Sequence, residues 1–89
     1  MTSDVEVSAS ASGIRRIRQD RTQWRVLVET WPERDGFRGR FVFASESPTI
    51  PTDLRAGPDA LRGRTREDVI AQAYTLPEDR LKQLLRSLG

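Results

Sequence analysis

The residue types that most often do chemistry in proteins are missing from this chain of 89 residues, which contains no Cys and no His. Thiol nucleophiles, imidazole bases, disulfides and zinc sites built on these ligands are therefore excluded. Ser and Thr hydroxyls have no imidazole to activate them, and the single Lys, Lys82, falls on the outer face of an expected helix. We therefore expect no catalytic residue, no cofactor and no small-molecule substrate.

Thirteen Asp and Glu side chains remain as candidates for acid-base or metal chemistry. None lies in an apolar stretch that would tune a general acid, and those at 67–68 and 78–79 fit the first turns of helices. Their spacing does not match a calcium-binding loop, and the Gly residues do not form a phosphate-binding loop. The sequence thus predicts a protein that is not an enzyme and holds no metal.

Arginine is the residue type that could bind a partner, since it makes up 14 of the 15 basic residues. The net charge of the whole chain is only +2. Residues 14–45 hold eight Arg against four acidic residues, a net charge of +4, so the excess of positive charge lies there. Guanidinium groups favour carboxylates, phosphates and aromatic rings. An acidic protein surface or a nucleic acid would suit this region, whereas the alternative is a solvated sheet face.

The basic region has the alternation of β-strands. Trp24, Val26 and Val28 fall on one side of an extended chain, and Phe41 and Phe43 do the same further on. The connection WPERDGF (31–37) contains turn formers, which predicts a hairpin. Residues 14–19 are expected to form a third strand, although Ile14 and Ile17 are three apart, as in a helical turn.

Two helices are expected after a Pro- and Gly-rich segment at 46–64. This segment is long for a loop, so either it covers a binding surface, or 60–64 pairs as a short extra strand. Thr65 precedes two acidic residues and should cap the first helix. Residues 75–78 (TLPE) have the form of a capping box for the second. Its apolar residues repeat at helical spacing and are Leu81, Leu84, Leu85 and Leu88. A helix-turn-helix is the weaker interpretation of this pair, because core packing explains the pattern.

Together these elements predict an α+β fold, a two-layer sandwich in which a three-stranded antiparallel meander packs against two C-terminal helices. Residues 14–89 would form this single domain, and residues 1–13 a disordered N-terminal tail, with a short strand through Val5 and Val7 as the alternative. No apolar run approaches the roughly 20 residues that a bilayer span requires. We therefore expect a soluble, cytoplasmic protein that does not bind a membrane.

If the helices cover one face of the sheet, the other face has an apolar centre bordered by Arg. We predict that this face binds a protein partner or a second copy of the chain, with Trp31 in the hairpin connection as an aromatic anchor. The alternative is a nucleic-acid-binding module that uses residues 14–45, which is weaker because Phe41 and Phe43 should lie in the core. The candidate partner-binding residues are Arg25, Leu27, Trp31, Arg38, Arg40, Val42 and Ala44, with Arg16 and Arg18 as further members of the rim.

Overall fold

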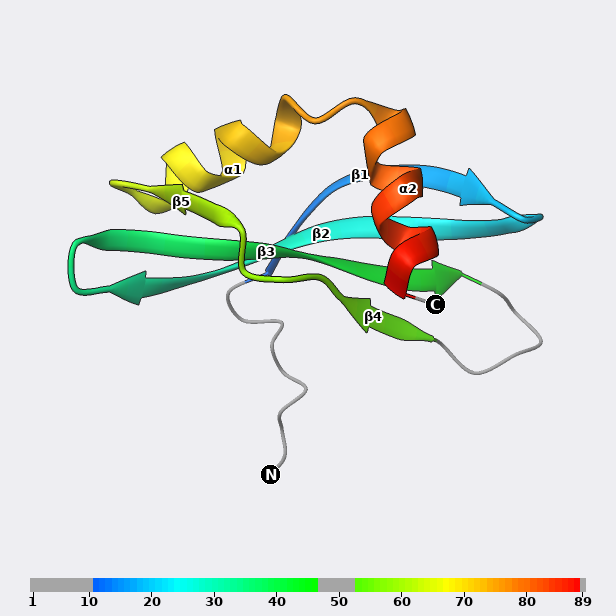
Figure 1. Ribbon diagram of the computed structural model, residues 1–89, viewed down its shortest axis with the longest axis horizontal. Helices are drawn as coiled ribbons and strands as arrows, with labels where there is room; N and C mark the ends of the chain where they lie inside the picture. Colours follow the sequence, from blue (N-terminus) through cyan, green and yellow to red (C-terminus); the bar gives the residue numbers. More distant parts are fainter. Residues whose placement is uncertain (1–10, 47–52, 89) are drawn as a thin grey trace.

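A computed structural model describes residues 11–46 and 53–88, in which an antiparallel sheet has two helices on one face (Figure 1). The sheet order is β1-β2-β3-β4, and β5 also pairs with β3. This arrangement confirms the predicted α+β fold. The elements are β1 (Ala11–Gln19), β2 (Thr22–Glu33), β3 (Gly36–Glu46), β4 (Leu54–Ala56), β5 (Leu61–Gly63), α1 (Arg66–Tyr74) and α2 (Glu78–Leu88).

The first strand, β1, confirms the expected strand at 14–19 and begins earlier than the sequence suggested. Residues 11–13 pair with 27–29 of β2, so the ordered domain starts at least three residues before position 14. A β-bulge between Gly13 and Arg15 shifts the register by one residue. The bulge explains why Ile14 and Ile17 are three apart and yet both pack toward the core. Residues 1–10, including the alternative strand at Val5 and Val7, lie outside the described residues.

Two tight turns connect the three long strands. Asp20 and Arg21 join β1 to β2, and both have a positive φ, of 53° and 67°, as a type I′ turn requires. Between β2 and β3 the turn is only Arg34 and Asp35, so the predicted seven-residue connection is wrong. Strand β2 continues through Pro32, which is compatible with a strand here because the pairing with β1 ends at Glu29.

The Pro- and Gly-rich segment contains two short strands that extend the sheet beyond β3. Strand β5 confirms the alternative of a strand within 60–64, and it pairs with β3 at residues 37–39. Strand β4 was not expected, and it pairs with β3 at residues 42–44. The interpretation of 46–64 as a loop is therefore wrong at β4, while its alternative is confirmed at β5, and residues 47–52 lie outside the described residues.

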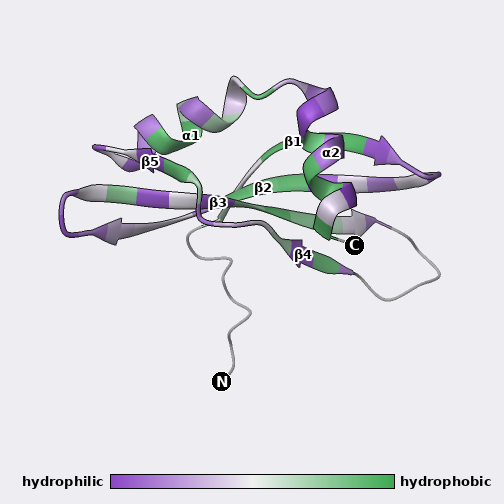
Figure 2. Ribbon diagram, viewed as in Figure 1, coloured by the Kyte–Doolittle hydropathy of each residue, from purple (hydrophilic) through white to green (hydrophobic). Residues whose placement is uncertain are grey.

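The core lies between the sheet and the helices, as predicted, and Figure 2 shows the hydrophobic colouring on the strands beneath them. Gly39 lets α1 lie close to β3, because a Cβ at this position would stand 2.5 Å from Val69 Cγ1. The buried apolar side chains come from the sheet and from both helices: Ile17, Trp24, Val26, Val28, Phe41, Phe43, Leu61, Val69, Ala73, Leu81 and Leu85.

The helix ends agree with the sequence for α1 but not for α2. The Asp68 backbone N–H donates to Thr65 Oγ1 at 3.1 Å, so Thr65 is the expected N-cap. The predicted capping box at 75–78 is wrong, because the Thr75 hydroxyl donates to the Gln72 carbonyl at 2.7 Å and closes the end of α1. Helix α2 begins at Glu78, directly after Pro77. No helix in the described ranges is long and apolar enough to cross a membrane.

Candidate protein-interaction surface

The face of the sheet opposite the helices, here called the open face, is the candidate site. Both helices lie on the same side of the sheet in Figure 1, and within residues 11–46 and 53–88 no helix or strand covers the other side. The alternation of β2 and β3 directs Leu27, Val42 and Ala44 to the open face, where all three are half-buried. Leu27 and Val42 are direct cross-strand neighbours. The structure thus brings together the three apolar residues that the sequence predicted.

Strand β4 enlarges this apolar centre with two residues that the sequence analysis missed. Ala56 pairs with Val42, and Leu54 pairs with Ala44, so both continue the outward rows of β3. Leu54 is 61% exposed, the largest exposure among the described large hydrophobic residues. The alternation in Leu54-Arg55-Ala56 was the available signal, but three residues among prolines are too few to separate a strand from a loop. We call the resulting set the apolar patch, which is Leu27, Val42, Ala44, Leu54 and Ala56.

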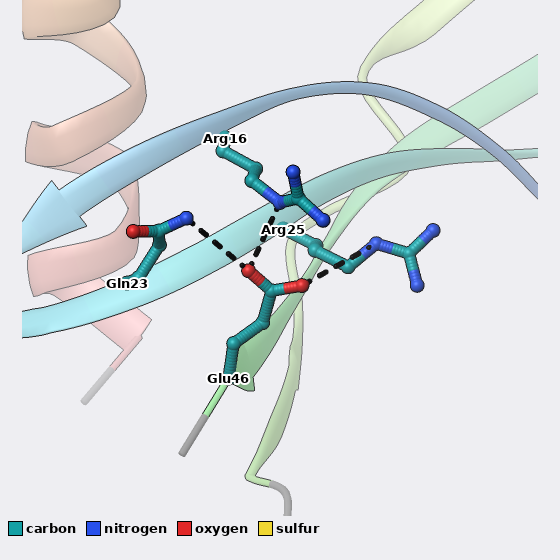
Figure 3. Close-up of polar contacts among 4 residues, drawn as sticks. All are labelled: Arg16, Gln23, Arg25 and Glu46. Atoms are coloured by element: carbon teal, nitrogen blue, oxygen red, sulfur yellow. Dashed lines mark hydrogen bonds and ion pairs between the residues drawn. The ribbon is translucent and has the colours of Figure 1, made fainter. Parts of the chain in front are cut away.

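One end of the apolar patch is bordered by a shared carboxylate (Figure 3). Glu46 Oε1 lies 3.0 Å from Arg16 Nε, and its Oε2 lies 3.9 Å from Arg25 Nε. Gln23 Nε2 also donates to Oε1, at 3.4 Å. The figure shows Arg16, from β1, and Arg25, from β2, each in contact with one oxygen of the carboxylate from the end of β3. Two of the expected rim arginines are therefore partly neutralised by the chain itself.

The other end of the apolar patch has a second ion pair and the expected tryptophan. Arg40 Nε lies 2.6 Å from Glu29 Oε1, and the two residues are cross-strand partners. The Arg40 guanidinium carbon lies 5.9 Å from the centre of the Trp31 ring, and Trp31 Nε1 donates to Glu33 Oε2 at 3.2 Å. Trp31 belongs to β2, not to the hairpin connection as predicted, so the strand holds its ring at the margin of the open face.

Arg38, another predicted rim residue, also has acidic partners. Its Nη1 lies 3.1 Å from Asp59 Oδ2, and its Nε lies 3.7 Å from Glu33 Oε1. Asp59 comes from the segment between β4 and β5, which links Arg38 to the outer edge of the sheet. Arg18 is exposed on β1, two residues beyond Arg16 and so on the same side of that strand. The rim therefore consists mainly of paired charges of both signs, not of free positive charge as the sequence suggested.

Other arginines stabilise the helix side of the sheet. The Arg55 guanidinium lies 4.8 Å from the centre of the Trp24 ring, and Asp53 Oδ2 accepts hydrogen bonds from both its Nε and Nη2. Arg15 Nη2 lies 3.6 Å from Glu78 Oε1, and its Nη1 donates to the Leu76 carbonyl at 3.4 Å. The Arg15 contacts tie β1 to the helix layer, and the Arg55 contacts join β4 to Trp24 of β2, so a part of the arginine content is structural.

The described residues contain no group of three or more acidic side chains that could hold a metal ion. Comparison with protein-family models, with curated proteins and with solved structures gives no match. The geometry of the open face is therefore the basis for assigning a function.

Proposed function

We propose that this chain is a non-catalytic interaction module that binds a protein surface through its open face. The observation that supports this function is the apolar patch. A sheet with one face toward water usually presents polar side chains there. Here Leu27 and Val42 occupy the middle of the two longest strands, and Leu54 is 61% exposed beside them.

The border of the apolar patch has the composition of a protein interface. Protein-binding surfaces combine an apolar centre depleted of charge with a polar rim, and aromatic residues and Arg are enriched in them. The rim here contains Trp31 and the pairs Arg40–Glu29 and Arg16–Glu46. A partner can bury the apolar patch while these ion pairs form its border.

Nucleic-acid binding is less consistent with the same surface. Guanidinium groups that already pair with carboxylates attract phosphates less strongly, and here Arg16 and Arg25 share Glu46, while Arg40 pairs with Glu29. Single-strand recognition also needs exposed rings on which bases stack. Phe41 and Phe43 are buried beneath the helices.

The experiment is site-specific photo-cross-linking in cells from Leu54→p-benzoylphenylalanine, which places the reactive group within the apolar patch. Gln83→p-benzoylphenylalanine is the matched control, because Gln83 is exposed on α2, on the opposite side of the molecule. We expect a defined protein adduct from position 54 and none from position 83. The adduct should disappear when Ala56→Asp is added, and Leu27→Asp with Val42→Asp should have the same effect.

Two controls make the outcome decisive. Ala56 is exposed, so its substitution tests the apolar patch without altering the core. Far-UV circular dichroism of each variant should retain the helical signal. The proposal is overturned if position 54 gives no adduct, or if positions 54 and 83 give the same one. It is also overturned if fluorescence anisotropy shows oligonucleotide binding that weakens with salt and disappears when Arg25, Arg38 and Arg40 are replaced.

A further inference from the structure

We infer that the partner on the open face is a second copy of this chain, packed patch against patch about a two-fold axis. This inference rests on the proposed function and names the occupant of the same surface. Three features of the open face support it: the distribution of its charges, its area, and the position of the apolar patch within it.

The charges of the open face suit an identical surface better than a strongly charged partner. Each end of the apolar patch has a carboxylate in contact with arginine: Glu46 with Arg16 and Arg25 at one end, and Glu29 with Arg40 at the other. A strongly acidic or basic partner would have to compete with these internal pairs. A second copy brings the same nearly balanced set of five rim arginines and four carboxylates, so the rims can meet with only a small excess of positive charge.

The area of the open face is near the lower limit of what a stable dimer needs. Its four strands β1 to β4 have 9, 12, 11 and 3 residues. With a rise of about 3.3 Å per residue and a strand spacing of about 4.8 Å, they cover roughly 550 Å² in projection. A specific protein–protein interface buries about 600–1,000 Å² on each partner. Only contact over the whole open face and its rim would approach this range, and a copy of the same sheet has the matching outline.

The apolar patch determines where the two-fold axis lies. Its residues come from three adjacent strands, and the middle strand is β3, which contributes Val42 and Ala44. In a two-fold contact, residues beside the axis meet their own counterparts. Packing the two apolar patches on each other therefore places Val42 and Ala44 opposite the same residues of the second copy. The two sheets would lie about 10 Å apart, with the helices on the outside.

Single-cysteine variants test this geometry directly, because the natural sequence contains no Cys. The purified chain with Ala44→Cys is treated with a short bis-maleimide linker, and Gln83→Cys is the control on the outer surface of α2. We expect Ala44→Cys to be cross-linked mainly to twice the chain mass, several-fold more than Gln83→Cys. Light scattering of the unmodified chain should show a dimer that Ala56→Asp converts to a monomer, whereas Gln83→Asp, with the same change of charge, leaves it dimeric.

The inference is overturned if the chain stays monomeric over the accessible concentration range and Ala44→Cys is cross-linked no more than Gln83→Cys. The in-cell experiment then separates the two proposals. A photo-adduct from position 54 at a mass other than twice the chain would retain the protein-binding function with a different partner. The lack of any adduct would refute that function as well.

Discussion

The close approach of α1 to the sheet gives a prediction for Gly39→Ala. A Cβ at this position would stand 2.5 Å from Val69 Cγ1 and 3.1 Å from the Glu29 carbonyl oxygen. Val69 is fully buried, so it has no free space into which to move. Helix α1 would have to shift outward, which weakens its packing on β3.

The magnitude follows from two opposing effects. Replacing Gly by Ala inside a strand ordinarily stabilises the fold by about 0.5–1 kcal/mol, because Gly loses more conformational freedom on folding. Overfilling a packed core costs about 1–3 kcal/mol. We therefore expect Gly39→Ala to lower the free energy of unfolding by about 1–2 kcal/mol. Gly57→Ala is the matched control, because a Cβ there has its nearest neighbour at 3.6 Å, an ordinary contact. It should leave stability unchanged or raise it slightly.

Urea unfolding at 25 °C, followed by circular dichroism, measures both variants. The contact with Val69 is tested by a double-mutant cycle, since Val69→Ala removes the methyl group that the new Cβ at position 39 would meet. In that background we expect the cost of Gly39→Ala to fall by about 1 kcal/mol. A Gly39→Ala chain as stable as the original one, or a cost that Val69→Ala leaves unchanged, would refute the packing argument.

Three further predictions concern turns, caps and ion pairs. Arg21 has a φ of 67°, a conformation that costs most side chains about 1 kcal/mol, so Arg21→Gly should raise the unfolding free energy by about 0.5 kcal/mol in urea titration. Thr65→Ala removes the acceptor for the Asp68 N–H and should lower the melting temperature, with a decrease of about 1 kcal/mol in the free energy of unfolding. Thr65→Ser keeps the hydroxyl and should retain most of the original stability. Glu46→Gln breaks the exposed pairs with Arg16 and Arg25 and should lower the free energy of unfolding by less than about 1 kcal/mol at low salt. If the same loss persists at about 1 M salt, it does not come from exposed ion pairs, which salt screens.

The sequence predicted the fold correctly where strand alternation or helical spacing of apolar residues extended over several positions. Alternation over Trp24, Val26 and Val28 identified the face that lies under the helices, and the leucines at 81 and 85 identified the helix face that meets it. The bulge in β1 could not be predicted, because the inserted residue imitates the three-residue spacing of a helix. Strand β4 has three residues and forms through pairing with β3, a tertiary contact that local patterns do not encode, and β5, which is equally short, could be given only as an alternative to a loop.

The candidate site was predictable in its apolar part and not in its electrostatics. Leu27, Val42 and Ala44 followed from alternation alone. The pairing of Arg16 and Arg25 with Glu46 depends on the register of three strands, and a shift of one residue would turn Glu46 to the helix side. Counting charges along residues 14–45 therefore indicated a basic surface, whereas the folded sheet combines those arginines with acidic side chains, one of which, Glu46, lies just beyond that range.

The two tryptophans stand seven positions apart on one strand, an odd separation that sends their rings to opposite faces. Trp24 is 5% exposed within the core, and Trp31 lies at the margin of the open face. The molecule therefore contains two tryptophan fluorophores with different surroundings. Emission from Trp24 reports whether the helix layer is docked, and emission from Trp31 reports what touches the outer surface, so folding and association have separate optical signals in one unlabelled chain.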